Sequence, residues 1–310
     1  MISAQDVTYD YPAGRALDGV SFEVRRGAVL ALVGANGAGK STLMRCIAAL
    51  EPPTAGRITV DGVDTRADPR RVHASLGYLP DFFGLYDALP VRRCLVYAAR
   101  SRGAAADAAE AAAVRAAARV DLSDRLEQRA GELSRGLRQR LAIAQTLVHG
   151  PSVLLLDEPA AGLDPEARAS LSELIRSLAA EGMTLIVSSH ILAELEDYCT
   201  EMLMLREGRI AGEGVVSAGR TAPAAAGRAR VVLAAPVEDL GGRLAALGFQ
   251  VETADAQEAV LTLGPGADAE SEALARLVAA GLRVSGFAPV RPTLEAAYLR
   301  EARKGPGGPA

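Results

Sequence analysis

Hydrophobic and polar residues alternate in short runs over the first 30 residues, for example at Val20-Ser21-Phe22-Glu23-Val24. Alternation with a period of two is typical of half-buried strands. Pro12-Ala13-Gly14 and Gly27 place turn residues between these runs. The pattern therefore predicts an antiparallel β region over residues 1–30.

The pattern changes from strand to helix after residue 33. Val29 to Val33 is a compact apolar run that leads into a glycine-rich loop, and apolar residues from Ser41 onward have helical spacing. Strand signals are absent from about 87 to 148, where the alanine-rich stretch 104–118 has strong helix propensity. We expect a strand, a loop and a helix, followed by an inserted helical subdomain over about 87–148.

Buried strand patterns return at residues 153–156 and 184–187, on either side of a helical pattern. The apolar face of that helix is predicted to consist of Leu171, Leu174, Ile175 and Leu178. Strands that alternate with helices make a parallel sheet covered by helices. The first 216 residues are therefore predicted to form one α/β domain.

Glycine, alanine and proline dominate residues 217–227, which predicts a linker. Beyond it, residues 228–303 are predicted to form a small α+β domain, and residues 304–310 a mobile tail. The pattern predicts strand 229–234, helix 237–247, strands 249–254 and 258–263, helix 269–280 and strand 282–288. This βαββαβ order is that of a ferredoxin-like domain.

Composition narrows the class of protein. The chain has 310 residues, 49% of them hydrophobic, and a formal net charge of -4, so a globular protein is expected and a basic nucleic-acid-binding surface is not. Three widely spaced cysteines without C-x-x-C spacing indicate a reducing compartment, and the N-terminus lacks the pattern of a signal peptide. Because no uncharged stretch is long enough to span a bilayer, we expect any membrane role to depend on a partner.

The glycine-rich loop matches the phosphate-loop pattern G-x-x-x-x-G-K-[ST], between a strand and a helix. Glycines allow backbone N–H groups to surround phosphates, the lysine neutralises the β and γ phosphates, and the hydroxyl ligates Mg²⁺. Lys40 is also one of only two lysines among 34 basic residues. A plain glycine-rich turn is the structural alternative. The predicted ATP-binding residues here are Gly34, Ala35, Asn36, Gly37, Ala38, Gly39, Lys40, Ser41 and Thr42.

Two carboxylates, Asp157 and Glu158, follow the apolar run 153–156 and precede Pro159. The end of a buried strand is where an α/β sheet presents its ligand site. Asp157 is predicted to hold Mg²⁺ together with Ser41, and Glu158 to polarise the attacking water as a general base. Taken alone, an acidic turn would explain the same residues.

Leu133-Ser134-Arg135-Gly136-Leu137 precedes an arginine-rich helix start. With this segment, residues 1 to about 215 resemble the ATPase subunits of ABC transporters, whose signature reads LSGGQ. The resemblance implies that Ser134 and Gly136 bind the γ-phosphate held by a second protomer, as helix N-termini do. Arg135 and Leu137 replace the usual glycine and glutamine, as in ATPases that pair with exporter-type membrane subunits. The alternative is that Ser134 only caps its helix.

The resemblance implies further roles. Asp164, in Ala161-Gly162-Leu163-Asp164, matches the D-loop that links the two sites of a dimer, and His190 matches the switch histidine that contacts the γ-phosphate. Tyr11 stands where the family stacks an aromatic ring on adenine, with Tyr9 as the competing register. Asp81 stands where the family usually has glutamine as a Mg²⁺ ligand. Its charge is expected to change metal affinity or coupling.

Together these observations predict a P-loop NTPase of the ABC type, with an antiparallel β region, an inserted helical subdomain and a ferredoxin-like C-terminal domain. The resemblance implies a Mg²⁺-ATP-hydrolysing motor that dimerises head to tail, with itself or a close relative. It would lie in the cytoplasm, at the inner face of the membrane, and power export through a separate permease subunit. The segment 292–299 resembles the closing segment of ABC-2-type exporter ATPases, or is one packed helical face. A soluble ABC ATPase acting on ribosomes or DNA and a nucleotide-gated binding module remain the alternatives.

Overall fold

The structure is a computed structural model, and it describes residues 1–189, 191, 195–215, 227–264 and 268–289. Contacts divide the chain into two compact units. The larger contains the N-terminal 215 residues, and the described part of the smaller spans 227–264 and 268–289. The domain limits inferred from the sequence stay a prediction. The predicted linker 217–227, apart from Gly227, and the tail 304–310 lie outside the described residues.

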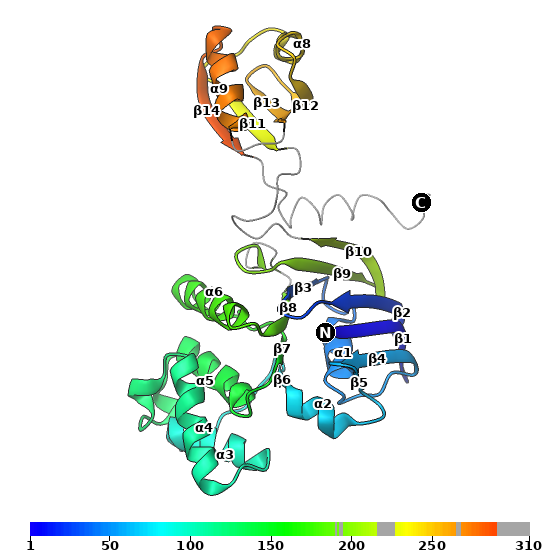
Figure 1. The fold of residues 1–310 in the computed structure, drawn as a ribbon, viewed down its shortest axis with the longest axis vertical. Helices are drawn as coiled ribbons and strands as arrows, with labels where there is room; N and C mark the ends of the chain where they lie inside the picture. The colour runs from blue at the N-terminus through cyan, green and yellow to red at the C-terminus, as the bar shows by residue number, and fades with distance from the viewer. Residues whose placement is uncertain (190, 192–194, 216–226, 265–267, 290–310) are drawn as a thin grey trace. The chain divides into compact units, whose positions relative to one another are not determined.

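The larger unit is built on two sheets (Figure 1). The antiparallel sheet has the order β2-β1-β4-β5, and the other has the order β10-β9-β3-β8-β7-β6, in which only β10 runs antiparallel to its neighbour. The strands of the antiparallel sheet are β1 (Ile2–Tyr11), β2 (Gly14–Val24), β4 (Ala55–Val60) and β5 (Val63–Asp64). Those of the second are β3 (Val29–Val33), β6 (Leu76–Leu79), β7 (Val153–Leu156), β8 (Thr184–Ser189), β9 (Glu201–Arg206) and β10 (Arg209–Val215).

Helices complete this unit. They are α1 (Lys40–Ile47), α2 (Pro69–Ser75), α3 (Val91–Ser101), α4 (Ala106–Arg119), α5 (Arg135–Leu147) and α6 (Pro165–Ala180), with short 3-10 turns at Ser123–Arg125 and Ala130–Glu132. The expected antiparallel region and helical insertion are therefore confirmed. β4, β5, α2, β6, β9 and β10 were not anticipated by the pattern.

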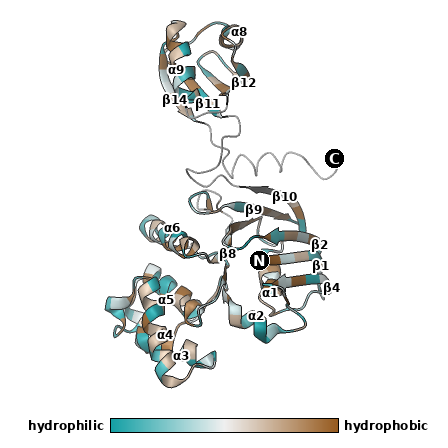
Figure 2. Cartoon of the chain, viewed as in Figure 1, coloured by the Kyte–Doolittle hydropathy of each residue, from teal (hydrophilic) through white to brown (hydrophobic). Residues whose placement is uncertain are grey.

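Strand β3 explains how the sheet is buried on both sides. Its residues alternate between two hydrophobic clusters: Val29, Ala31 and Val33 belong to the cluster that includes α3 to α6, whereas Leu30 and Leu32 belong to the one formed with α1 and the antiparallel sheet. A parallel strand covered on both faces reads as a continuous apolar run. In Figure 2, hydrophobic (brown) and hydrophilic (teal) residues are mixed along the helices of this unit.

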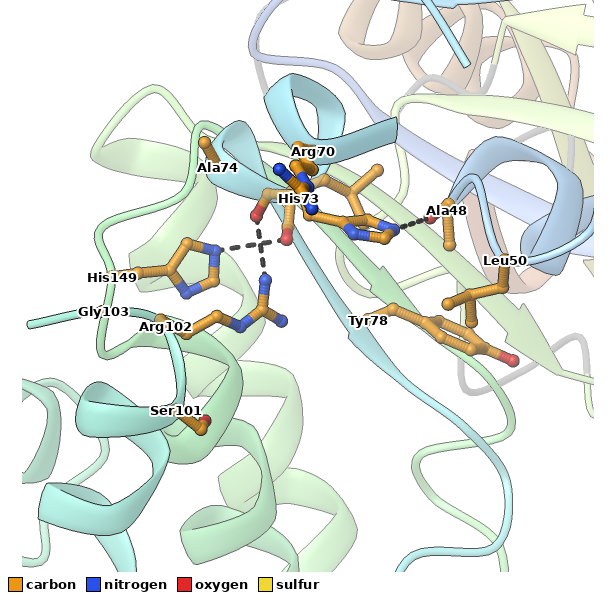
Figure 3. Close-up of a pocket in the computed structure, with 11 residues that line it drawn as sticks. Ala48, Leu50, Arg70, His73, Ala74, Tyr78, Ser101, Arg102, Gly103 and His149 are labelled. Atoms are coloured by element: carbon orange, nitrogen blue, oxygen red, sulfur yellow. Dashed lines mark hydrogen bonds between the residues drawn. The ribbon is translucent and has the colours of Figure 1, made fainter. Parts of the chain in front are cut away.

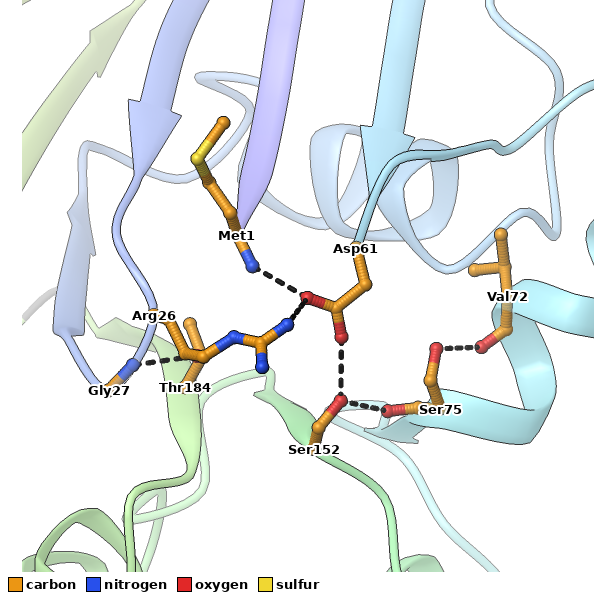
Figure 4. Close-up of polar contacts among 8 residues, drawn as sticks. All are labelled: Met1, Arg26, Gly27, Asp61, Val72, Ser75, Ser152 and Thr184. Carbon is orange, nitrogen blue, oxygen red and sulfur yellow. Dashed lines mark hydrogen bonds and ion pairs between the residues drawn. The ribbon is translucent and has the colours of Figure 1, made fainter.

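Asp61, in the turn between β4 and β5, ties several segments together (Figure 4). Its Oδ1 accepts from the Met1 amino group and from Arg26, each at 2.8 Å, and its Oδ2 accepts from Ser152 Oγ at 2.9 Å. Burial alone would raise the pKa of Asp61, but the hydrogen bonds from Met1, Ser152 and Arg26 outweigh it and lower the pKa to about 2. This carboxylate therefore joins the antiparallel sheet to the start of β7.

The smaller unit has the predicted βαββαβ order. Its elements are β11 (Arg228–Leu233), α8 (Leu240–Ala246), β12 (Gln250–Ala254), β13 (Glu258–Thr262), α9 (Ala269–Ala279) and β14 (Val284–Pro289). The sheet order is β12-β13-β11-β14 with antiparallel neighbours, which is the ferredoxin-like arrangement. Its own core of apolar side chains includes Val231, Leu244, Leu261 and Leu277.

Candidate functional site

The phosphate loop connects the end of β3 to the start of α1, as predicted. Two glycines in it have no room for a side chain: a Cβ at Gly34 would lie 2.5 Å from Leu205 O, and one at Gly39 would lie 2.7 Å from Ala16 O. Gly39 also has φ 104°, and Gly37 φ 80°, both in the left-handed region. The loop can therefore run close under a ligand with its backbone N–H groups available.

Lys40 is the first residue of α1 and its side chain is only 6% exposed. Its Nζ donates to Gly34 O at 2.7 Å and to Ala35 O at 3.4 Å, and it lies 3.5 Å from Glu158 Oε1. A buried ammonium group is costly unless it is paired and hydrogen-bonded. The fold thus holds a cation at the mouth of the phosphate loop with a carboxylate beside it.

Asp157 and Glu158 follow β7, whose neighbours in the sheet are β6 and β8. Asp157 is 2% exposed, and its Oδ1 accepts from Ser188 Oγ at 2.5 Å. The same hydroxyl accepts from the Glu158 backbone N–H at 2.8 Å. Glu158 has φ 48°, the left-handed conformation that non-glycine residues rarely adopt. Ser188 therefore fixes both acidic residues, a role that the sequence reasoning did not assign to it.

A cavity of about 630 Å³ lies in front of the loop. Most of the predicted ATP-binding residues line it, together with Glu158 and Asp81. Arg15 and Ala16 of β2 form part of its wall and were missed by the sequence reasoning, because no local motif marks them. Ala38 is buried behind the loop, where its N–H donates to Ala35 O at 3.1 Å.

Tyr11 lines this cavity, whereas Tyr9 packs against the hydrophobic cluster beneath it. The Tyr11 hydroxyl lies 3.3 Å from Thr42 Oγ1 and donates to Glu51 Oε2 at 3.2 Å. The two rings meet edge to face with centroids 4.8 Å apart. This placement favours Tyr11 over Tyr9 as the adenine-stacking residue, and that role stays a prediction.

The residues at this cavity fit Mg²⁺-ATP. Gly34 and Gly39 let the loop pack against the backbone of Leu205 and Ala16, and Lys40 supplies positive charge to the cavity. Ser41 and Asp81 line the same cavity, and the buried Asp157 carboxylate directly precedes the lining residue Glu158. Hydroxyl and carboxylate oxygens are the ligands that Mg²⁺ prefers.

Ser134, Gly136 and Asp164 lie elsewhere, around a second pocket of about 310 Å³ that shares no lining residue with the first. Ser134 caps α5 by accepting from Leu137 N at 3.4 Å, and Asp164 caps α6 by accepting from Ala167 N at 2.8 Å. Within one chain these residues are therefore not brought to the phosphate loop. His190 and the segment 292–299 lie outside the described residues.

A third cavity, of about 890 Å³, separates the end of α1, α2 and β6 from the end of α3 (Figure 3). Arg102 donates to His73 O at 2.9 Å, and a ring nitrogen of His149 lies 3.2 Å from Leu76 O. Burial lowers the pKa of His149, and the charge of Arg102 lowers it further. The walls of this groove combine cationic and apolar groups, among them Arg70, Leu50 and Tyr78.

Comparison with known proteins extends this picture. Residues 17–161 match the family model for the ABC transporter domain. The chain is 37% identical over 213 residues to the Nod factor export ATP-binding protein I of Burkholderia pseudomallei (strain 1710b), covering 69% of this chain and 70% of that protein. It is 36% identical over 203 residues to the ABC transporter ATP-binding protein NatA of Bacillus subtilis (strain 168), covering 65% and 82%.

A solved ATP-binding subunit of an ABC transporter has the same fold with a TM-score of 0.61 and 31% identity, covering 70% of this chain and 90% of that one. Among the helices that the structure describes, none has both the length and the apolar character that a bilayer-spanning segment requires. The expected fold and family are confirmed by these matches together with the phosphate-loop geometry. The chain belongs to the ABC transporter family, as one of its ATP-binding subunits.

Proposed function

We propose that this chain binds Mg²⁺-ATP at the phosphate loop and hydrolyses it with Glu158 as the general base. The observation that carries the proposal is the 3.5 Å approach of Lys40 Nζ to Glu158 Oε1 within the cavity that the loop lines. A phosphate placed beside Lys40 would bring the reacting γ-phosphorus close to that carboxylate. Hydrolysis needs charge neutralisation and an oriented water at one point, and these two side chains supply them.

Each remaining residue has a place in this proposal. Backbone N–H groups of residues 34–37 and 39 would surround the phosphates, whereas the predicted contribution of Ala38 is limited because its N–H donates to Ala35 O. Tyr11 would stack on adenine, and Thr42 would lie beside Tyr11 at the rim. Ser41, Asp157 and Asp81 would hold Mg²⁺, which neutralises charge on the β and γ phosphates when bound. His190 is proposed as a further donor to the γ-phosphate, by the family resemblance of its position.

We also propose that the ATP site is completed by a second protomer. Ser134 is exposed, and the start of α5 borders a pocket that shares no lining residue with the phosphate-loop cavity. A helix N-terminus of this kind binds anions. Placed against the γ-phosphate of another copy, Ser134, Gly136 and Asp164 would close the site in a head-to-tail dimer.

Transport, and export in particular, is proposed from the relatives and from one surface. A named relative is a Nod factor export protein. On this chain, Phe82 is 90% exposed and Tyr86 53%, on the segment between β6 and α3, and Tyr97 of α3 is 55% exposed. Exposed aromatic side chains of this kind suit a protein contact. We propose that a permease subunit binds there and holds this chain at the cytoplasmic face of the membrane.

The first experiment measures ATP turnover of the purified chain with Mg²⁺ and compares it with Glu158→Gln. Loss of a general base lowers turnover by about 10²-fold or more. The variant should still bind ATP and accumulate as an ATP-dependent dimer in size-exclusion chromatography. Normal hydrolysis by Glu158→Gln would remove Glu158 from this role.

A second experiment tests the partner. The tagged chain is purified from detergent-solubilised membranes of its host, and accompanying proteins are identified by mass spectrometry. A stoichiometric polytopic membrane protein supports the transport proposal, and Phe82→Ser should weaken its recovery. Recovery of ribosomal proteins instead would favour a soluble ABC ATPase.

A further inference from the structure

Arg135 is the first residue of α5, and its side chain crosses to the loop between β7 and α6. Its Nη2 donates to Ala161 O at 3.5 Å, which is a long hydrogen bond. The guanidinium also covers Gly162: a Cβ there would overlap with Nη2 and lie 2.5 Å from Cζ. The space that a side chain at residue 162 would need is therefore occupied by Arg135.

The loop that Arg135 covers leads back to Glu158 within a few residues. Ala161 N donates to Glu158 O at 3.0 Å, and Leu163 N donates to Ala160 O at 3.2 Å. The two bonds fold residues 158–163 into consecutive tight turns. A displacement of Ala161 or Gly162 is therefore transmitted directly to the backbone of Glu158, which already has φ 48°.

The two helices beside this contact are also packed closely. A Cβ at Gly136 would lie 3.0 Å from Ala167 Cβ, so α5 and α6 approach each other at their N-terminal ends. Arg140, one turn further along α5, donates to the Ser170 hydroxyl of α6. The start of α5 therefore has a defined position relative to the loop, and Arg135 has a fixed base from which to reach it.

We propose that Arg135 is a positioning residue for Glu158: by packing on Gly162 and bonding Ala161, it holds the turn that sets the direction of the Glu158 carboxylate. The inference rests on the proposed hydrolysis. A displacement on the order of 1 Å at a catalytic group can lower a rate up to about 10²-fold, so a contact three residues away has a measurable effect. It also makes the conformation of Glu158 depend on the position of the helical subdomain.

The test is a double-mutant cycle on ATP turnover with Arg135→Gly, Gly162→Ala and both. An alanine at residue 162 displaces the guanidinium, and removing the arginine removes the same contact. Each single variant should lower kcat about three- to tenfold with KM changed less than about twofold, and the double variant should be no slower than the slower single variant. Any effect of alanine on the φ of +68° at residue 162 is present in both backgrounds and cancels in the cycle.

Arg138→Ala is the matched control. Arg138 lies one turn along the same helix, pairs with Asp87 Oδ1 at 2.7 Å and donates to Ala130 O at 3.0 Å, without touching the loop. It should leave kcat within about twofold, because it does not act through Glu158. Arg135→Gln, which keeps part of the stem and a donor, should fall between wild type and Arg135→Gly, and it serves if the glycine variant does not fold.

The outcomes separate the two claims. If the wild-type chain shows no hydrolysis that depends on Glu158, the proposed function fails. If it hydrolyses ATP and Arg135→Gly does so equally fast, only the positioning role fails. The positioning role would also fail if the loss of kcat in the double variant equalled the product of the losses in the two single variants. Such a result would mean that Arg135 acts only elsewhere, for example on a partner's phosphate.

Discussion

The phosphate-loop cavity and the pocket around Ser134 differ in how their polar side chains are held. In the first, Lys40 is 6% exposed, and Asp157, next to the lining residue Glu158, is 2% exposed; both are fixed by hydrogen bonds. In the second, Ser134 and Asp164 are exposed, and each caps its own helix. The side chains of the first region converge on one cavity within the chain. In the second region, the N-terminal ends of α5 and α6 are exposed.

The two regions therefore depend on a ligand in different ways. A buried cation such as Lys40 is kept in place by the interior and is ready for a ligand before it arrives. An exposed helix end is stable with its own cap and gains a second function only when a charged group is brought to it. Substitutions in the two regions should therefore affect ATP turnover in different ways.

Lys40→Met should have the largest effect, because Lys40 is the one basic residue within the phosphate loop, residues 34–42, and only Arg15 of the cavity wall would remain. ATP turnover should fall about 10²- to 10³-fold, in the range found when a single group that stabilises transition-state charge is lost. ATP binding, measured by fluorescence of a nucleotide analogue, should weaken as well. Lys304→Met removes the other lysine of the chain and serves as the control. Equal ATP turnover of Lys40→Met and Lys304→Met would contradict the proposed role of Lys40 at the phosphates.

Ser134→Ala should have a smaller effect that depends on association. A hydrogen bond to a charged group contributes about 1.5–3 kcal/mol, so turnover should fall about 10- to 100-fold. Binding of ATP to the dilute chain should be unchanged. The cap control is Asp68→Ala, because Asp68 accepts from Arg71 N at 3.1 Å and caps α2. Both variants lose about 1 kcal/mol of stability, and a comparable loss of turnover in both would show that Ser134 acts only as a cap.

Asp81→Gln tests the departure from the family pattern at the rim of the first cavity. An amide oxygen can replace a carboxylate oxygen as a Mg²⁺ ligand and carries no charge toward the γ-phosphate. Turnover should stay within about tenfold of wild type, with a changed dependence on Mg²⁺ concentration. Complete loss of activity would show that the carboxylate itself is needed.

Asp61→Asn should leave turnover unchanged and affect stability alone. The pKa of Asp61 is about 2 in the fold, below its usual 3.8, so its contribution is fully present above pH 4 and is lost as pH falls toward 2. From the shift, the variant should be about 2 kcal/mol less stable at pH 7. Calorimetric melting of both proteins at pH 7 and pH 3 should show the difference shrinking at the lower pH. If the two proteins differed in stability by the same amount at pH 7 and pH 3, the pKa of Asp61 would not be what stabilises the fold.

The sequence was sufficient where the chemistry is local. The run from Val29 to Ser41 contains its strand, loop and helix within one segment, and residues 153–158 contain a strand and its two carboxylates. Periodicity also predicted the order of all elements in the smaller unit, since each of its strands and helices has a strong pattern of its own.

The wall formed by Arg15 and Ala16 could not be predicted in this way. These residues come to the cavity only because the antiparallel sheet packs against the phosphate loop, where Ala16 O lies 2.7 Å from the position of a Gly39 Cβ. Ser188 is similar, since its contact with Asp157 depends on the pairing of β7 with β8. Contacts between segments more than 20 residues apart leave no signal in local periodicity.

The left-handed backbone of Glu158 has a consequence for engineering. A non-glycine residue at φ 48° costs about 1 kcal/mol or more, and a glycine there would relieve that cost. The same change would leave the buried Lys40 without its neighbouring carboxylate, so the two effects on stability oppose each other. A screen for folding alone would not register the loss of the proposed base, so a library built on this chain should be screened for stability and activity together.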